Sequence, residues 1–289
     1  MTLSRTLAAF LLFSSLALAE DPVVVASKQL IAAHQDSLVS ITAVVKMSMS
    51  GGGTRGAPQE RKMDSPGTVI DASGLVVTSL TRLDPTALMA SMGGGMRGIE
   101  SSIQEVKVVM GDGTEIPGQI VLKDADLDLA FVRADTTSKE AKGIKFLPID
   151  LADSTKVSPG EGLIGLARAD ETVGRVPGVR LDHVFTVAKR PREFVLVSST
   201  DFLGSPVYTE SGKLVGIGIL RPGRSVNRSS TAIAVADDVK EVAEQAKAAK
   251  PKPPVAKKDK EPKAEEAAPK VESKPEAKPE PKKAEASAQ

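Results

Sequence analysis

The sequence predicts an all-β fold built in two halves, with a short helix at each end. Between Ser37 and Ala236 it consists of many short runs rich in Val, Ile and Leu, and turn residues separate these runs at close intervals. Hardly any part of this region repeats its apolar residues with the period of a helix. Closely spaced strands of this kind are typical of a β-barrel or a β-sandwich.

The two expected helices lie at the ends of the folded region. A short helix over about 24–34 precedes the first strand. At the other end, Val235, Val239, Val242 and Ala246 follow one another at three- and four-residue spacing, which places them on one face of a helix.

The first half is expected to occupy about 37–135. Residues 72–74 and 111–113 combine Gly with Asp, Ser or Ala, so each is predicted to be the turn of a hairpin. The expected strands of this half are 38–49, 68–71, 75–78, 106–110, 115–121 and 127–134.

The second half is expected to occupy about 144–236. Pro159 and Gly160 lie near the junction of the two halves, within 154–161. Its expected strands begin near 162 and continue over 181–188, 193–199, 206–209, 213–220 and 231–236.

Residues 1–19 have the pattern of a secretory signal peptide. A positive charge at Arg5 precedes an apolar run over 7–18, and the small residues Ala17 and Ala19 suit cleavage after Ala19. The run is shorter than the ~20 apolar residues of a membrane-spanning helix, and no later segment is long and apolar enough to span. We therefore expect a periplasmic or secreted protein without an integral membrane segment after cleavage.

The C-terminal segment, 248–289, consists almost entirely of Lys, Pro, Ala and Glu. It cannot bury enough apolar surface to offset the entropy of ordering, so we expect a disordered tail. The tail could act as a solubilising spacer or as a tether to the cell envelope. The folded domain is then 20–247.

Composition excludes several classes of function. The chain has no cysteine, which rules out disulfides, a thiol nucleophile and a thiolate metal site. A net charge of +1 offers no basic surface for nucleic acid. The glycine runs at 51–53 and 93–95 lack the Lys and Ser/Thr of a phosphate-binding loop, so no cofactor is predicted.

A Met- and Gly-rich loop over 84–100 is a candidate partner-binding loop. Met89, Met92 and Met96 could supply thioether ligands to Cu(I) in an exported protein. Flexible apolar contacts with a partner are the better interpretation of these three side chains. No metal site is predicted.

Three segments, in order along the chain, resemble the HtrA (Deg) branch of the trypsin-like serine proteases. Residues 65–83, SPGTVIDASGLVVTSLTRL, resemble the strand-turn-strand that leads into the catalytic histidine. Residues 112–133, with DGTE at the start and KDADLDLAFVR at the end, resemble the hairpin and strand that hold the catalytic aspartate. Residues 203–217, LGSPVYTESGKLVGI, resemble the segment that follows from the nucleophile.

The resemblance implies a chymotrypsin/trypsin-like double β-barrel and assigns the family's catalytic positions. Thr81 stands at the histidine position, Asp128 at the aspartate position and Leu203 at the serine position, while Asp201 replaces the glycine of the oxyanion hole. A threonine hydroxyl cannot act as general base near neutral pH, and an Asp carboxylate would repel the developing oxyanion. No intact catalytic triad is therefore expected.

Other residues could in principle replace the lost groups. Ser205, two positions after Leu203, is a candidate atypical nucleophile, but the only histidines are His34 and His183, far from the aspartate segment in the family's layout. For Asp128 we expect hydrogen bonds to local backbone or to Arg82.

The alternating carboxylates over 124–128 resemble part of a calcium loop. A central Gly and a bidentate Glu at the required offsets are missing, so we expect a solvated turn.

The leading hypothesis is an exported, non-catalytic, protease-like binding or scaffold protein whose partner is a protein or peptide. One alternative is an active serine-type endopeptidase with an atypical nucleophile, and another is an envelope spacer that acts through its tail. Relatives of this kind often trimerise through residues near the start of the barrel. Because only 3% of this chain is aromatic, its oligomeric state stays open.

Overall fold

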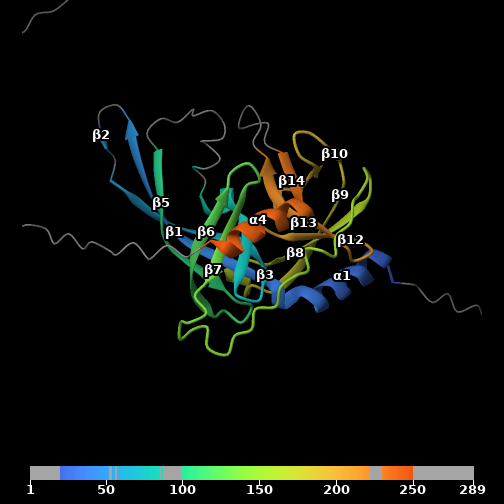
Figure 1. Cartoon of the computed structure of the whole chain (residues 1–289), viewed down its shortest axis with the longest axis horizontal. Helices are drawn as coiled ribbons and strands as arrows, with labels where there is room; N and C mark the ends of the chain where they lie inside the picture. Colours follow the sequence, from blue (N-terminus) through green and yellow to red (C-terminus); the bar gives the residue numbers. More distant parts are fainter. Residues whose placement is uncertain are drawn as a thin grey trace, which may run out of the picture. The chain divides into compact units, whose positions relative to one another are not determined.

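The computed structural model describes residues 20–51, 54–55, 57–84, 86, 99–221 and 230–249. These residues belong to one compact unit of the chain and form two antiparallel sheets (Figure 1). Three predicted features lie outside them, namely the signal peptide over 1–19, the Met89, Met92 and Met96 side chains, and nearly all of the tail.

The chain enters the fold through helix α1, Pro22–His34, which is continued by the 3-10 turn Gln35–Ser37. Asp21 caps the helix, because its carboxylate accepts a hydrogen bond of 2.9 Å from the N–H of Val23. Pro22 fits the first helical position, where no N–H is needed. The helix buries Leu30 against the strands that follow.

The first half is a barrel of six strands. The sheet order is β2-β1-β3-β4-β7-β6-β5, and a further pairing of β1 with β5 closes it, with the short β2 attached outside the ring. The elements are β1 Leu38–Gly51, β2 Thr54–Arg55, β3 Gln59–Asp71, β4 Leu75–Ser79, α2 Leu80–Leu83, β5 Ile99–Val109, β6 Glu115–Asp124 and β7 Leu129–Ala134.

The tight turn between β3 and β4 forms as its sequence predicts. Gly74 adopts φ 82°, which a residue with a Cβ rarely does, and the Asp71 carboxylate accepts from the N–H of Ser73 at 2.9 Å. The N-terminal part of β3, 59–67, was not predicted as strand because it is mostly charged or polar. It forms because its backbone pairs continuously with β1 from Met47 to Val39.

The second half is a curled half-barrel of seven strands in the order β10-β11-β14-β13-β12-β8-β9. The segment predicted as one strand over 181–188 is divided, because β9 pairs with β8 whereas β10 pairs with β11. The elements are β8 Gly162–Arg168, η2 Glu171–Val173, β9 Pro177–His183, β10 Thr186–Ala188, β11 Phe194–Leu196, η3 Thr200–Phe202, β12 Pro206–Thr209, β13 Leu214–Arg221 and β14 Ser230–Val235.

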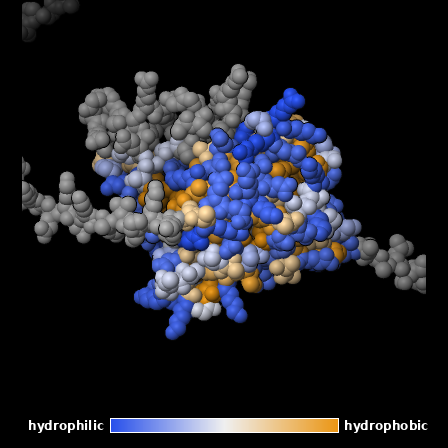
Figure 2. Space-filling view, viewed as in Figure 1, coloured by the Kyte–Doolittle hydropathy of each residue, from blue (hydrophilic) through white to orange (hydrophobic). Residues whose placement is uncertain are grey.

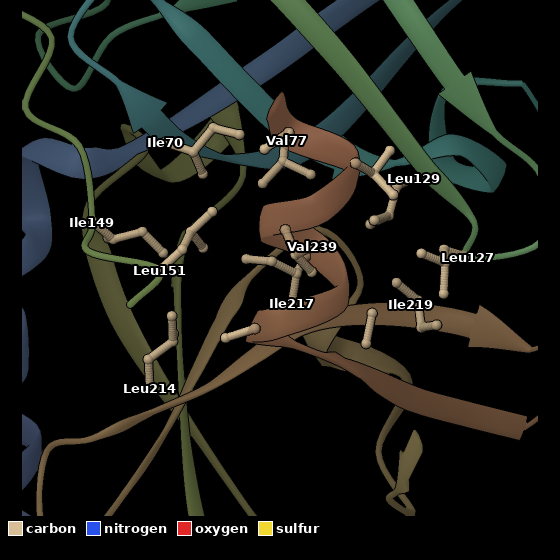
Figure 3. Close-up of a cluster of buried hydrophobic side chains, with 14 of the residues drawn as sticks. Ile70, Val77, Leu127, Leu129, Ile149, Leu151, Leu214, Ile217, Ile219 and Val239 are labelled. Carbon is tan, nitrogen blue, oxygen red and sulfur yellow. The ribbon is translucent and has the colours of Figure 1, made fainter. Parts of the chain in front are cut away.

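The largest core cluster joins the two halves (Figure 3). It combines side chains from both sheets with the apolar face of helix α4, Ala236–Ala248, from which Val239 projects among them. Side chains of this cluster include Val77, Leu127, Leu129, Leu214, Ile217 and Ile219. The predicted all-β architecture in two halves with a helix at each end is thus confirmed, with a closed first barrel and a second sheet that is curled but not closed.

Arg133 fastens the end of α4 to the first barrel. Its Nη2 donates hydrogen bonds to the carbonyls of Ala246 at 2.9 Å and Lys247 at 3.1 Å, two groups that the last helical turn leaves without partners. The Lys247 ammonium also lies 3.3 Å from the Asp71 carboxylate. Helices of the described part of the chain are too short or too polar to cross a membrane.

Removing a side chain from the shared core should cost more than removing an exposed one of the same type. We expect Leu129→Ala, at a residue with no exposed surface, to lower the free energy of unfolding by about 2–5 kcal/mol through lost burial and a cavity. Leu147, which is 48% exposed, provides the matched control. Leu147→Ala should change the free energy of unfolding by less than about 0.5 kcal/mol. Equal losses in urea titrations would contradict this assignment of the core.

Candidate functional site

Asp128 lies in the turn between β6 and β7, where the local sequence forces its backbone into an unusual conformation. The Asp124 carboxylate accepts from the N–H groups of Asp126 at 3.0 Å and Leu127 at 2.9 Å, which closes a local turn. Leu127 and Leu129 are fully buried on either side. Asp128 between them takes φ 53°, and only 4% of its surface is exposed.

The Asp128 carboxylate accepts four hydrogen bonds. Oδ1 accepts from the N–H of Thr81 at 2.7 Å and from the Thr81 hydroxyl at 2.6 Å. Oδ2 accepts from the Ser79 hydroxyl at 2.7 Å and from the N–H of Leu220 at 2.8 Å. The structure therefore brings Thr81 and Asp128, two of the predicted site residues, into direct contact. Arg82, an expected partner of Asp128, makes no hydrogen bond to it within the described residues.

These donors come from both halves of the protein. Ser79 caps the short helix α2, which carries Thr81, and both belong to the first barrel. Leu220 belongs to β13 of the second sheet. A second hydrogen bond also joins the two halves, because Nη1 of Arg221 in β13 donates to the carbonyl of Asp126 at 3.0 Å. The guanidinium of Arg221 also lies 4.0 Å from the centre of the Phe194 ring.

Burial raises the pKa of the Asp128 carboxyl above its ordinary value. The hydrogen bonds from Thr81, Leu220 and Ser79 act in the opposite direction, since they favour the ionised form, but they offset burial only in part. Asp128 is thus a buried carboxyl that retains its proton to a higher pH than an exposed one.

Asp201 and Leu203 lie in and after the 3-10 turn η3. The Ser199 hydroxyl caps this turn and accepts from the N–H of Asp201 at 3.1 Å. The Asp201 side chain is 54% exposed, and its carboxylate lies 2.9 Å from the guanidinium of Arg180 on β9. Both the backbone N–H and the carboxylate of Asp201 therefore have partners.

Gly204 holds the turn after η3 against the first barrel. It adopts φ 80°, and a Cβ at this position would lie 2.4 Å from the carbonyl oxygen of Pro66 and 3.0 Å from the Thr78 hydroxyl. The Thr68 hydroxyl donates to the carbonyl of Gly204 at 3.3 Å. Only glycine permits this approach, which places the turn beside the strand that ends in Ser79.

The side chains next to Gly204 point into the core. Leu203, which the sequence resemblance assigns to the serine position, is 7% exposed, and Phe202 has no exposed surface. Ser205 is 1% exposed, and within the described residues its hydroxyl has no hydrogen-bond partner. The candidate nucleophile proposed from sequence is therefore enclosed by protein.

Neither histidine is a hydrogen-bond partner of Asp128. His34 ends α1 and stacks on Tyr208, with 4.9 Å between ring centroids, and burial lowers the pKa of its imidazole. His183 ends β9 and is exposed. No group of three potential metal ligands occurs among the described residues.

Sequence reasoning missed four contributors, namely Ser79, Leu220, Ser199 and Arg180. Ser79 could have been found, since a Ser directly before a short helix is a preferred cap. Leu220 contributes only its backbone N–H, which no residue type signals. Arg180 reaches Asp201 from a strand distant in sequence, so only the fold relates them.

Comparison with known proteins finds one matching family pattern and similarity to solved structures. The sequence pattern of the family described as "Trypsin-like peptidase domain" matches residues 66–217, more than half of the chain. Among solved structures, the chain matches the crystal structure of the MamO protease domain from Magnetospirillum magneticum in its apo form, with 22% identity and a TM-score of 0.43 over 72% of this chain and 95% of that chain. No curated protein matches the chain in sequence.

The raised pKa of Asp128 gives a defined pH dependence. Because the folded state binds this proton more tightly than the unfolded state, the stability gained through Asp128 is fully present below the unfolded pKa and is lost as pH rises through the folded pKa. The free energy of unfolding of the native chain, minus that of Asp128→Asn, should therefore fall from acidic to neutral pH. Urea titrations at several pH values measure this difference, and a rise with pH would contradict the assignment.

Proposed function

Because this chain belongs to the family of trypsin-like peptidase domains, we propose that it is a non-catalytic binding module of that fold, which holds an extended peptide or protein segment outside the cytoplasm. One observation carries the proposal. The carboxylate that would orient a catalytic imidazole instead accepts both the N–H and the hydroxyl of Thr81.

Proton transfer is the first missing function. In the family's mechanism an imidazole takes the proton of the nucleophile while the carboxylate orients the imidazole. Thr81 donates its hydroxyl hydrogen to Asp128 at 2.6 Å and offers no basic nitrogen. The histidines at positions 34 and 183 lie on α1 and β9, so neither supplies the base.

The nucleophile and the oxyanion site support the same conclusion. Leu203 has no nucleophilic atom, and the hydroxyl of Ser205 is enclosed by protein, which argues against an atypical serine peptidase. The N–H of Asp201 is already bound to Ser199, and the adjacent carboxylate would oppose negative charge on a reaction intermediate.

The parts of the fold that support binding are intact. Asp128 fixes the end of β13 to the first barrel, and Gly204 keeps the turn after η3 packed against β3. A scaffold of this rigidity can hold a peptide between the two halves without cleaving it. We define the site surface as Thr81 and Arg221, which contact the turn at 126–128, together with the ion pair of Arg180 and Asp201.

Export and tethering complete the proposal. The signal-peptide pattern over 1–19 supports a periplasmic or secreted location. The Lys, Pro, Ala and Glu composition over 248–289 supports an extended tether that connects the module to the cell envelope. If the resemblance to the HtrA branch holds, the chain would be a relative of those proteases that binds peptides without cleaving them.

The proposal predicts the absence of serine-peptidase chemistry. Purified protein should neither hydrolyse unfolded casein nor become labelled by a fluorophosphonate probe from mildly acidic to mildly alkaline pH, because base, nucleophile and oxyanion site are all lost. An active trypsin-like protease serves as the positive control. Hydrolysis that survives Asp128→Ala but disappears in Ser205→Ala would overturn the proposal.

Binding itself can be tested with a bulky substitution on the site surface. Fluorescence anisotropy with labelled, unfolded casein peptides should show saturable binding that Asp201→Trp weakens about tenfold or more by obstruction. Asp153→Trp is the matched control, because Asp153 is also in an exposed ion pair, with Lys213, and its side chain is 57% exposed against 54% for Asp201. Equal effects of the two variants, or no binding by the native chain, would contradict the proposal.

A further inference from the structure

The turn that connects β8 to β9 contains a buried arginine in an unusual backbone conformation. Arg175 takes φ 52°, and among the described residues Asp128 is the only other non-glycine residue with a positive φ. Only 7% of the surface of Arg175 is exposed. A left-handed residue with a side chain persists where surrounding contacts hold it, and such residues cluster at clamps and switches. The contacts of Arg175 therefore indicate the role of this turn.

The guanidinium of Arg175 reaches across to the first barrel. Its Nη1 donates to both carboxylate oxygens of Asp64 on β3, each at 3.2 Å. Its Nη2 donates to Oε2 of Glu171 in its own turn at 3.1 Å, and Nζ of Lys62 on β3 donates to the same oxygen at 3.0 Å. Each half thus supplies one cation and one carboxylate. We call these four residues the latch.

Arg175 is the only buried residue of the turn. The other residues over 170–176 are all exposed, and they include the apolar side chains of Val173 and Val176 at 60% and 55%. The turn therefore buries no apolar side chain, and its attachment to β3 depends on charge. Segments that bury so little apolar surface open with the smallest free energies in a folded protein.

Burial distinguishes the latch from an ordinary surface ion pair. Hydrophilic residues cover much of the face of the molecule in Figure 2, and ion pairs between such exposed groups contribute little to stability. The Arg175 side chain is only 8% exposed, so the loss of a carboxylate would leave its charge poorly compensated and drive it toward water. The side chains of Asp64 and Glu171 are 37% and 61% exposed, so dissolved ions can weaken the latch from outside.

Hydrogen bonds at the base of the turn do not depend on the latch. The N–H of Arg175 donates to the carbonyl of Asp170 at 3.2 Å, which closes the turn on itself. Arg168, just before the turn, donates from Nε to the carbonyl of Leu38 at 2.6 Å and from Nη2 to that of Gln35 at 2.7 Å. Its Nη1 also donates to the carbonyl of Arg175 at 3.1 Å. The turn thus has a fixed base and a free end that only the latch holds to β3.

We propose that residues 169–176 form a strap that closes on the first barrel through the latch and opens locally while both sheets stay folded. Arg175 is its positioning residue. When the guanidinium leaves Asp64, the side-chain contacts that hold φ at 52° are lost and the turn relaxes. The strap adds a movable link between the halves to the buried one at Asp128. It does not depend on the function proposed for the site surface.

Limited proteolysis with trypsin tests the strap. Trypsin cleaves after Arg, and it can bind the Arg175 side chain only outside the latch. When opening is fast relative to cleavage, the rate at the Arg175–Val176 bond follows the population of the open strap. Asp64→Asn removes a carboxylate from the latch and should speed this cleavage about tenfold or more. Mass spectrometry of timed digests of the full chain measures the fragments that end at Arg175.

Two controls separate opening of the strap from general unfolding. Arg133 lies in β7 inside the closed barrel, so cleavage after Arg133 requires the barrel to open, and Asp64→Asn should leave that rate unchanged. Asp153→Asn breaks an exposed ion pair with Lys213 and should not affect cleavage after Arg175. Equal rates in the native chain and Asp64→Asn, or parallel increases after Arg175 and Arg133, would overturn the proposal. An equal increase in Asp153→Asn would do the same.

Salt provides a second test that begins from the native chain. Because dissolved ions weaken the partly exposed carboxylate contacts, a rise in NaCl concentration should speed cleavage after Arg175 in the native chain. The relative increase should be smaller in Asp64→Asn, in which the latch is already broken. Comparing the two chains at each salt concentration cancels the effect of salt on trypsin itself. Equal relative increases would mean that charge does not close the strap, which contradicts the proposal.

Discussion

One buried carboxylate holds the two halves of this protein in register. Asp128 accepts hydrogen bonds from the Thr81 and Ser79 segment of the first barrel and from Leu220 of the second sheet. A buried carboxylate without partners is costly, so the burial of Asp128 depends on these donors. The turn at 124–127, the cap of α2 and the end of β13 are all arranged around that requirement.

If the chain is the non-catalytic relative proposed above, this dependence explains how the scaffold persists without the family's reaction. In an active member the buried aspartate orients the imidazole and stabilises its charged form. In this chain the N–H and hydroxyl of Thr81 both donate to Oδ1 instead. A threonine in place of the imidazole removes a base. Because both oxygens of Asp128 still accept hydrogen bonds, the exchange should cost little stability.

The fold could be predicted largely from sequence, because turn residues and strand-forming runs are local signals. The polar part of β3 could not be predicted as a strand, since it becomes a strand only through its pairing with β1. For the site, the family pattern assigned catalytic positions to Thr81 and Asp128, but the side-chain partner expected for Asp128 was Arg82, and the hydrogen bond from the Thr81 hydroxyl was not predicted. The enclosure of Ser205 and the pair of Asp201 with Arg180 were not predicted either, because both depend on how η3 packs against distant strands.

The attachment of α4 to Arg133 has a mechanical consequence. A force applied to the chain beyond residue 249 would act on α4 first. The hydrogen bonds from Arg133 to the carbonyls of Ala246 and Lys247 would transmit this force to β7. Strand β7 lies between β4 and β6 in a closed ring, so the force would be shared among several ladders of hydrogen bonds. Tension would then be dissipated in the first barrel before it disturbed Asp201 and its neighbours.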